Sequence, residues 1–151
     1  MSPKENKISR IDFIKNSGAV LGGLVTLSHY ACSVDLSSLK ELIIEGNTNY
    51  SLVIPVKVND KEKNAAQQLQ FHLSKISKAL KVVNEEDYSG ENAIYLGNTD
   101  FAKFAGIETS LLGEDGYLFE RLDNNLVIAG GTENGLLNGV YSLLEYFGFR
   151  K

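Results

Sequence analysis

Residues 126–148 read LVIAGGTENGLLNGVYSLLEYFG, an apolar run that passes through two glycines into a long amphipathic segment. The run predicts a buried strand, Thr132 is a typical N-cap for the helix that follows, and Gly148 is a typical stop. Glycines recur every four residues from 131 to 139, which leaves a smooth strip where another backbone can approach the helix closely. The stretch therefore predicts a strand and a helix packed tightly on a sheet.

Two strands precede this stretch at short spacing. Residues 117–122 are separated from the apolar run at 126–129 by Asp-Asn-Asn, so the two segments predict a hairpin. Residues 93–97, AIYLG, predict a compact apolar strand that leads through Asn-Thr-Asp, a turn or cap, into a short helix ending at Phe104.

The beginning of the domain predicts two more extended segments, at residues 42–44 and 51–58. Apolar residues alternate along 51–58, which is the pattern of a half-buried strand. Because proline cannot donate a hydrogen bond to a central ladder, Pro55 predicts that this strand lies at the edge of the sheet.

A second long helix is predicted to begin at Asn59, since Glu62 follows three residues later as in a capping box. Its apolar stripe continues at spacings of three and four residues through Ala65, Leu69, Leu73, Ile76 and Leu80. His72 lies beside the stripe with no second acid or base in view, so it is predicted to be a surface or boundary residue rather than a catalyst.

The order strand, strand, helix, strand, short helix, hairpin, helix predicts an α+β fold. We expect a mixed or antiparallel sheet of four to five strands with two main helices packed on it as a two-layer sandwich. The chain has 151 residues, of which 43% are hydrophobic, and this is enough for one core without disulfides or a structural metal.

Residues 1–32 predict a signal peptide. Four positive charges within residues 1–15 precede the uncharged, mostly apolar run 17–28, which is too short to span a bilayer. Residues 9–15 resemble a twin-arginine export signal with Ile11 in the second arginine position, so the twin-arginine and general secretory routes both stay open. The sequence therefore predicts export to the periplasm or the cell surface.

The apolar run is followed by HYAC, which resembles a lipoprotein cleavage box and predicts lipidation at Cys32. A free or intermolecularly paired thiol is the alternative. Residues 33–40 then predict a polar tether, and residues 41–151 predict the folded domain, which would be anchored to a membrane only through the lipid.

Charge and residue types exclude several function classes. Without residues 1–32 the chain has 11 basic and 17 acidic residues, and it contains no basic run with interleaved aromatics, so nucleic acid is not an expected partner. The two histidines and one cysteine show no metal-ligand spacing, and no cofactor is expected. The acids at 85–87 predict a solvated loop rather than a catalytic pair, and the glycines at 130–131 lack the remainder of a phosphate-binding motif.

Three segments read together carry a family resemblance: NAAQQLQ at 64–70 with ISKA at 76–79, AIYLGNT at 93–99, and the hairpin and helix from 116 to 141. They resemble the accessory domain that precedes the catalytic barrel in alpha-glucuronidases of glycoside hydrolase family 67 and beta-hexosaminidases of family 20. The resemblance implies a role in carbohydrate metabolism.

In that family the catalytic acids lie in the following (β/α)₈ barrel, so the resemblance implies no catalytic residue in this chain. Residues 148–150, GFR, match the segment that leads to the barrel, whereas Lys151 stands where the family has tryptophan. We therefore expect an accessory domain without its barrel, which it would support in cis, as in the family, or in trans. Such a domain should expose a contiguous apolar face.

Two other functions stay open. A stand-alone surface lipoprotein that binds carbohydrate would stack sugar rings on flat aromatics, for which Tyr50, Tyr88 and Tyr117 are the candidates, since the chain has no tryptophan. An independent small enzyme is disfavoured because no nucleophile, base and orienting group can be named together.

Overall fold

A five-stranded mixed sheet forms the centre of the computed structural model, which describes residues 36–37, 40, 43, 50–77 and 80–150. The strand order is β2-β1-β3-β5-β4, and only β4 runs antiparallel to its neighbour. The strands are β1 (Ser51–Ile54), β2 (Lys81–Asn84), β3 (Ala93–Leu96), β4 (Tyr117–Leu122) and β5 (Asn125–Gly130).

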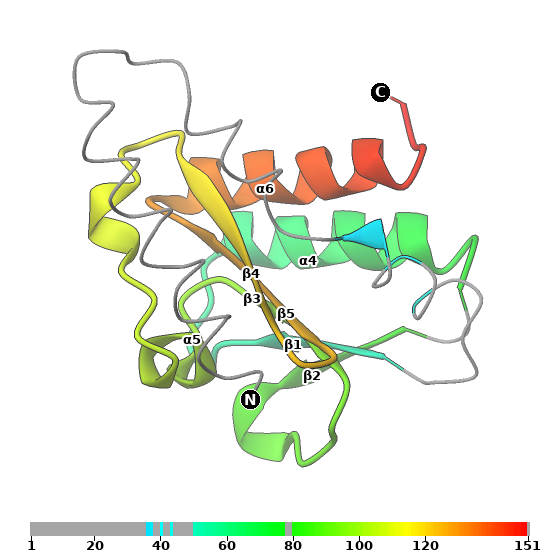
Figure 1. Ribbon diagram of the computed structural model, residues 1–151, viewed down its shortest axis with the longest axis horizontal. Coiled ribbons are helices and arrows are strands. Elements are labelled where there is room, and N and C mark those ends of the chain that lie inside the picture. The colour runs from blue at the N-terminus through cyan, green and yellow to red at the C-terminus, as the bar shows by residue number, and fades with distance from the viewer. Residues whose placement is uncertain (1–35, 38–39, 41–42, 44–49, 78–79, 151) are drawn as a thin grey trace.

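Two long helices, α4 (Asp60–Leu73) and α6 (Glu133–Tyr146), lie side by side on one face of this sheet (Figure 1). The main core lies between the sheet and these helices, with Leu52, Leu69 and Leu143 fully buried there. The other face carries a smaller core covered by α5 (Asp100–Phe104) and the 3-10 turn η2 (Thr109–Leu111). The predicted α+β sandwich of a mixed sheet and two main helices is confirmed.

The order of the strands differs from the prediction in one respect. β1 lies between β2 and β3, so it is an interior strand and its predicted edge position is wrong. The strand ends at Ile54, one residue before Pro55, and the missing N–H of the proline therefore costs no ladder hydrogen bond. Leu52 and Val53 are both buried, one on each face of the sheet, as an interior strand requires.

The strand predicted at 42–44 is wrong at Ile43, which has helical backbone and is buried; its two neighbours lie outside the described residues. The sheet is completed instead by β2, whose four residues the sequence analysis assigned to no element. Four half-exposed residues are too few for a recognisable alternation, and only pairing with β1 makes them a strand.

Helix α4 begins as predicted. The side chain of Asn59 accepts a hydrogen bond from Glu62 N at 2.9 Å, and Glu62 Oε2 accepts one from Asn59 N at 3.0 Å, which together form a capping box. The helix ends at Leu73, so Ile76 and Leu80 lie beyond it although the apolar stripe continues to them.

The hairpin and the last helix are also confirmed. β4 and β5 pair antiparallel around Asp123, whose positive φ of 55° makes the tight turn. Thr132 caps α6, and Gly148 follows its end with a φ of 98°. A Cβ on Gly135 would lie 2.2 Å from the carbonyl oxygen of Gly116, so the close approach predicted from the glycine spacing is present.

The predicted signal peptide at residues 1–32, with Cys32, lies outside the described residues. Most of the predicted tether at 33–40 does so too, but Leu36 is buried in the main core and its carbonyl accepts a hydrogen bond from Lys40 N at 2.8 Å. At least this part of the segment therefore packs against the domain. In the described part of the chain, no helix has the length and apolarity needed to cross a membrane.

Candidate functional site

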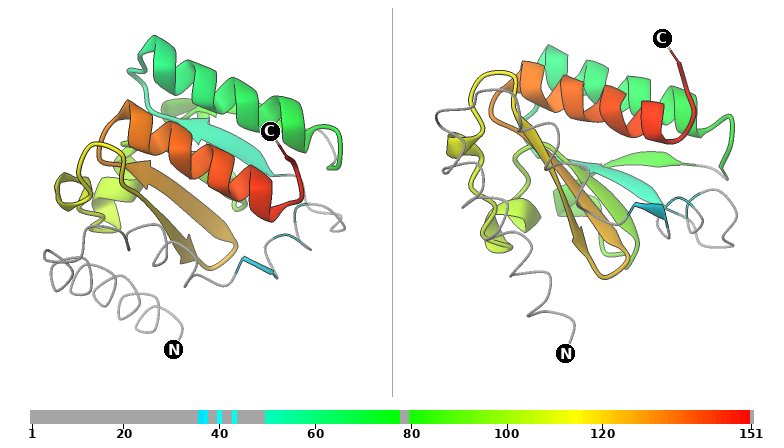
Figure 2. Two further views of the ribbon diagram at one scale, coloured as in Figure 1. Left: turned by 90° about the horizontal axis from the view of Figure 1, so that it is seen from above. Right: turned by 45° about the horizontal axis from the view of Figure 1, so that its top comes forward.

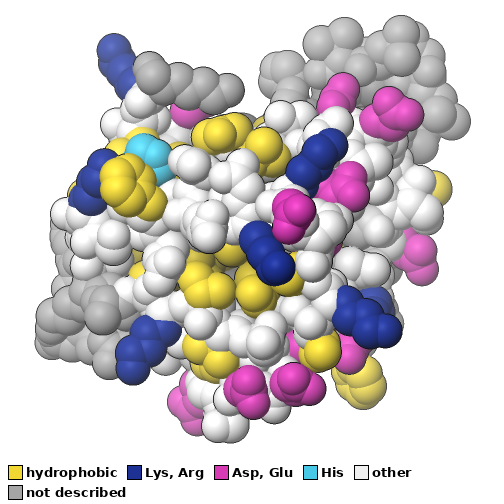
Figure 3. Space-filling model, turned by 180° about the vertical axis from the view of Figure 1, so that it is seen from behind, with side chains coloured by type: hydrophobic (Ala, Val, Ile, Leu, Met, Phe, Trp, Pro, Cys, Tyr) yellow, Lys and Arg dark blue, Asp and Glu magenta, His cyan; other side chains and the backbone are white. Residues whose placement is uncertain are grey.

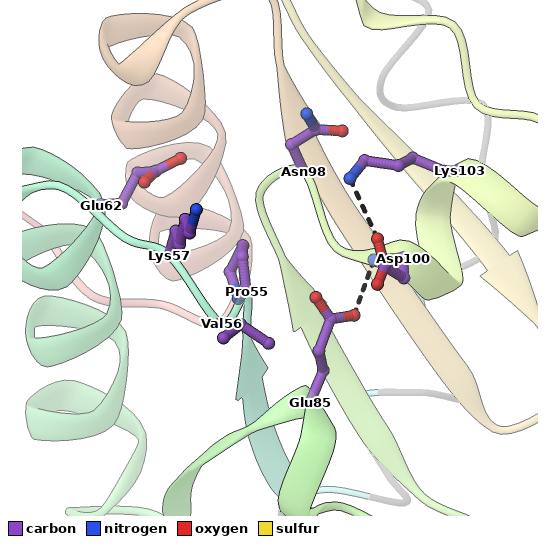
Figure 4. Close-up of a pocket in the computed structure, with 8 residues that line it drawn as sticks. All are labelled: Pro55, Val56, Lys57, Glu62, Glu85, Asn98, Asp100 and Lys103. Atoms are coloured by element: carbon purple, nitrogen blue, oxygen red, sulfur yellow. Dashed lines mark hydrogen bonds and ion pairs between the residues drawn. The ribbon is translucent and has the colours of Figure 1, made fainter.

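The parallel strands bring several polar side chains to one edge of the sheet. β1, β2, β3 and β5 all point the same way, so their carboxyl ends meet at this edge, and α4, α5 and α6 begin beside it. In parallel sheets this edge is where ligands usually bind. It contains a hollow of about 330 Å³ (Figure 4), lined by Pro55, Val56, Lys57, Glu62, Glu85, Asn98, Asp100 and Lys103.

The three carboxylates in the wall of the hollow each accept a hydrogen bond or an ion pair from the protein. Glu62 belongs to the capping box of α4, and Glu85 Oε2 accepts a hydrogen bond from Asp100 N at 2.6 Å. Asp100 Oδ1 in turn lies 3.0 Å from Lys103 Nζ (Figure 4). These bonds give the carboxylates structural roles at the starts of α4 and α5.

Two lining side chains, Lys57 and Asn98, are exposed and make no side-chain hydrogen bond or ion pair within the described residues. Together with the apolar wall of Pro55 and Val56, they give the hollow the character of a small polar surface pocket. It offers donors and acceptors to a polar ligand, and each of its three carboxylates already contacts one donor of the protein.

The acids at 85–87 form the 3-10 turn η1 (Glu85–Asp87), and Glu85 lines the hollow. Glu85 accepts a hydrogen bond from the first amide of α5, whose N-cap is Thr99, whereas the side chains of Glu86 and Asp87 are exposed. The sequence analysis did not identify the hollow, because its walls come from four separate segments. The available signal was the presence of a polar residue within a few positions after β1, β2 and β3, namely Lys57, Glu85 and Asn98.

The tyrosines proposed for sugar stacking do not form an exposed platform. Tyr50 is only 3% exposed and its hydroxyl donates to the carbonyl of Asn124 at 2.7 Å, so its assignment as a stacking candidate is wrong. Tyr88 is half-buried and its hydroxyl donates to the carbonyl of Asn92 at 2.8 Å. Tyr117 is also half-buried and packs against the main core.

Burial raises the pKa of three tyrosines, Tyr50, Tyr88 and Tyr95. For Tyr50, removal from water is the largest cause, and the positive charge of Arg121 acts in the opposite direction. Desolvation is also the largest cause at Tyr88 and Tyr95, where it favours the neutral hydroxyl.

His72 lies at the boundary predicted for it, half-buried near the end of α4. Its ring contacts Phe71 and Phe149 edge-on, with centroid distances of 5.2 and 5.1 Å. Its Nδ1 is buried without a hydrogen-bond partner among the described residues. Within the same residues, no group of three or more His, Cys, Asp or Glu side chains is placed to hold a metal ion.

The protein is a small α+β domain. At the carboxyl edge of its sheet, Glu62 and Glu85 accept hydrogen bonds from backbone N–H groups of the same chain. Residues 37–143 match the sequence profile of the family described as "Glycosyl hydrolase family 67 N-terminus". The match covers well over half of the chain, and the chain belongs to this family. It is therefore an accessory domain of the glycoside hydrolase type. No curated protein matches it.

Proposed function

We propose that this chain is the non-catalytic accessory domain of an alpha-glucuronidase-type enzyme, where it packs against a (β/α)₈ catalytic domain. The observation that carries the proposal is the family match over residues 37–143. The hydrogen bonds of the hollow support it, since Glu62 and Glu85 each accept a hydrogen bond from a backbone amide at the start of a helix. The related beta-hexosaminidase domains offer the same kind of role, but the match is to family 67.

The test is hydrolysis of glucuronoxylan fragments and aryl glycosides by the full chain, alone and mixed with the family 67 catalytic domain from the same organism. We expect no hydrolysis by the chain alone, and stable co-elution with the catalytic domain. Hydrolysis by the chain alone that Glu85→Gln or Glu62→Gln abolishes would make the hollow an active site and contradict the proposal.

The same samples distinguish the carbohydrate-binding alternative. Titration of the chain alone with glucuronoxylan fragments should give no heat of binding, because the candidate tyrosines are buried or half-buried. Saturable binding by the chain alone would favour a carbohydrate-binding module instead.

We also propose that the chain is exported and lipidated at Cys32, on the strength of the apolar run and the HYAC sequence that follows it. Mass spectrometry of the protein isolated from its own cells is the test. Lipidation predicts loss of residues 1–31 and an acyl-bearing mass on Cys32, whereas a mature protein that retains Met1 would contradict export.

A further inference from the structure

Exposed apolar side chains are scattered over the domain. Phe71 and Tyr146 lie near the ends of α4 and α6, Phe104 and Leu111 belong to α5 and η2, and Val56 lies in the wall of the hollow. The single contiguous apolar face expected from the sequence is therefore not present among the described residues. The hollow at the sheet edge, by contrast, brings apolar, acidic and basic side chains together in one place.

Glu62 and Glu85 each keep one carboxylate oxygen available in the hollow. Both residues are half-buried, and each binds a backbone N–H through Oε2, that of Asn59 at 3.0 Å and that of Asp100 at 2.6 Å. In the described part of the chain, Oε1 of neither residue accepts a hydrogen bond. The free oxygen of Glu85 points toward the middle of the hollow (Figure 4). Because a carboxylate has about four acceptor sites, both side chains can bind a further donor.

Gly97 keeps the space beside Glu62 open. This glycine follows β3 with a φ of 86°, and its N–H donates to the carbonyl of Ile128 at 2.8 Å. A Cβ at this position would lie 3.6 Å from Glu62 Oε1 and 3.8 Å from Pro55 Cγ, in contact with two residues that line the hollow. Since a positive φ favours glycine, the backbone conformation itself leaves this part of the hollow without a side chain.

The hollow contains charges of both signs that the protein does not pair. Asp100 and Lys103 form an ion pair at 3.0 Å. Glu62 and Glu85 bind only backbone N–H groups, and Lys57 makes no ion pair within the described residues. Two carboxylates and one ammonium group are therefore left for a ligand. Attraction between opposite charges is stronger beside half-buried groups than in open water.

The wall that contains Glu62 is held in place by contacts between the two long helices. At their starts, Asn59 Nδ2 donates to Glu133 Oε1 at 3.0 Å and Lys61 Nζ donates to Asn134 Oδ1 at 3.2 Å. Figure 2 shows that α4 and α6 lie side by side, and Figure 3 shows acidic and basic side chains intermixed over the starts of the helices. This wall is therefore formed before a ligand binds, which lowers the cost of binding.

The unpaired charges face each other across the hollow. Figure 4 shows Lys57 on one side and Glu85 on the other, with Asn98 between them. An anion alone would be repelled by the carboxylates, and a cation alone would be repelled by Lys57. A molecule with an ammonium group at one end and a carboxylate at the other pairs with both sides. The apolar wall of Pro55 and Val56 can contact a short carbon chain between these two groups.

We propose that the hollow binds a small zwitterion of the amino acid type, with its ammonium group on Glu85 and its carboxylate on Lys57. The side-chain amide of Asn98 donates to the same carboxylate. The volume of about 330 Å³ is at the lower end of the range for ligand sites, so the ligand has few carbon atoms. The site lies within this domain, and the proposal does not depend on the proposed function.

The test is a nuclear magnetic resonance titration of the full, isotope-labelled chain. The probes are glycine, β-alanine and 4-aminobutyrate, three zwitterions whose charges are separated by carbon chains of different length. We expect at least one of them to cause saturable shifts in the amide signals of Gly97, Asn98 and Asp100. Acetate and methylammonium, which each carry only one of the two charges, should bind at least tenfold more weakly.

Two variants test the assigned contacts. Lys57→Met removes the ammonium group from an exposed position, and Glu85→Gln removes a charge but keeps an oxygen that can accept from Asp100 N, so folding should be unaffected. Each should weaken binding of the zwitterion at least tenfold. Lys81→Met is the matched control, because Lys81 is an exposed lysine at the start of β2, at the opposite edge of the sheet, and this change should leave binding unaltered.

The absence of saturable shifts with all three zwitterions would overturn the proposal. Binding that Lys57→Met or Glu85→Gln leaves unchanged would overturn it too, since the two charges would then have other partners. Acetate or methylammonium that binds as tightly as the best zwitterion would show a site for a single charge, which also contradicts the proposal. None of these measurements uses a catalytic domain, so their outcome is separate from that of the test of the proposed function.

Discussion

The contact between α6 and the loop before β4 leads to a quantitative prediction for Gly135→Ala. An alanine Cβ at this position would lie 2.2 Å from the carbonyl oxygen of Gly116 and 3.3 Å from that of Glu114. Both atoms belong to the backbone, so no side chain can turn away. The helix and the loop must separate by about 1 Å to restore ordinary van der Waals contact.

The expected free-energy change is the sum of three effects. Overpacking of this kind costs about 1–3 kcal/mol. Movement of the loop also weakens the 2.9 Å hydrogen bond from Gly131 N to Gly116 O, a loss of about 1 kcal/mol. The higher helix propensity of alanine offsets about 1 kcal/mol of this loss of stability. The free energy of unfolding should therefore fall by about 2 kcal/mol, which lowers Tm by roughly 4–8 °C.

Urea unfolding of the full chain, followed by far-ultraviolet circular dichroism, measures this change. Gly139→Ala in the same helix is the matched control, because its Cβ would meet Ile128 Cγ2 at 3.0 Å and Tyr117 Cβ at 3.2 Å. A methyl group can yield by a few tenths of an ångström, so this variant should remain within about 1 kcal/mol of the wild type. A Gly135→Ala protein as stable as the wild type would refute the close-approach argument.

Three further predictions concern the cap, the core and the buried tyrosines. Asn59→Ala removes the N-cap of α4 and should lower the free energy of unfolding by about 1 kcal/mol in urea, whereas Asn64→Ala on the exposed side of the same helix should not. Leu69→Ala empties a fully buried position and should cost about 2–5 kcal/mol in the same assay; a change below 1 kcal/mol would contradict the assigned core. Because burial raises the pKa of Tyr50 above its ordinary value of 10.0, the folded state favours the neutral hydroxyl, which donates to Asn124 O. The stability that this group contributes is fully present below pH 10 and is lost as the pH rises from 10 toward the folded-state pKa. The urea midpoint of the wild type should therefore fall in that range, and that of Tyr50→Phe should fall less steeply. The same dependence of the urea midpoint on pH in both proteins would refute the assignment.

Capping and turn residues in the sequence correctly predict where helices and hairpins begin or end, because these boundaries depend on residues that are close in the chain. Asn59 and Glu62 are three residues apart and form the capping box that their spacing predicts. Thr132 and Gly148 delimit α6, and the turn at Asp123 joins two strands that pair over their full length. In each case the deciding hydrogen bonds connect residues that are close in the chain, so the pattern contains the information.

The hollow at the sheet edge could not be predicted in the same way. Lys57, Glu85 and Asn98 lie on three connections, after β1, β2 and β3, and only the parallel pairing of those strands makes them neighbours. The role of Glu85 as the hydrogen-bond acceptor for Asp100 N, fifteen residues away, had no sequence signal.

The sequence alone determined the fold class, the two long helices and the hairpin, because periodicity, caps and turn residues act over a few neighbouring positions. The family followed from the resemblance of three segments of the sequence to known accessory domains. The tertiary structure decided that β1 is interior, that Lys81–Asn84 is a strand, and that α4 and α6 lie side by side. These features depend on pairing and packing between segments far apart in the chain, and a local pattern does not specify which distant segment will lie beside it.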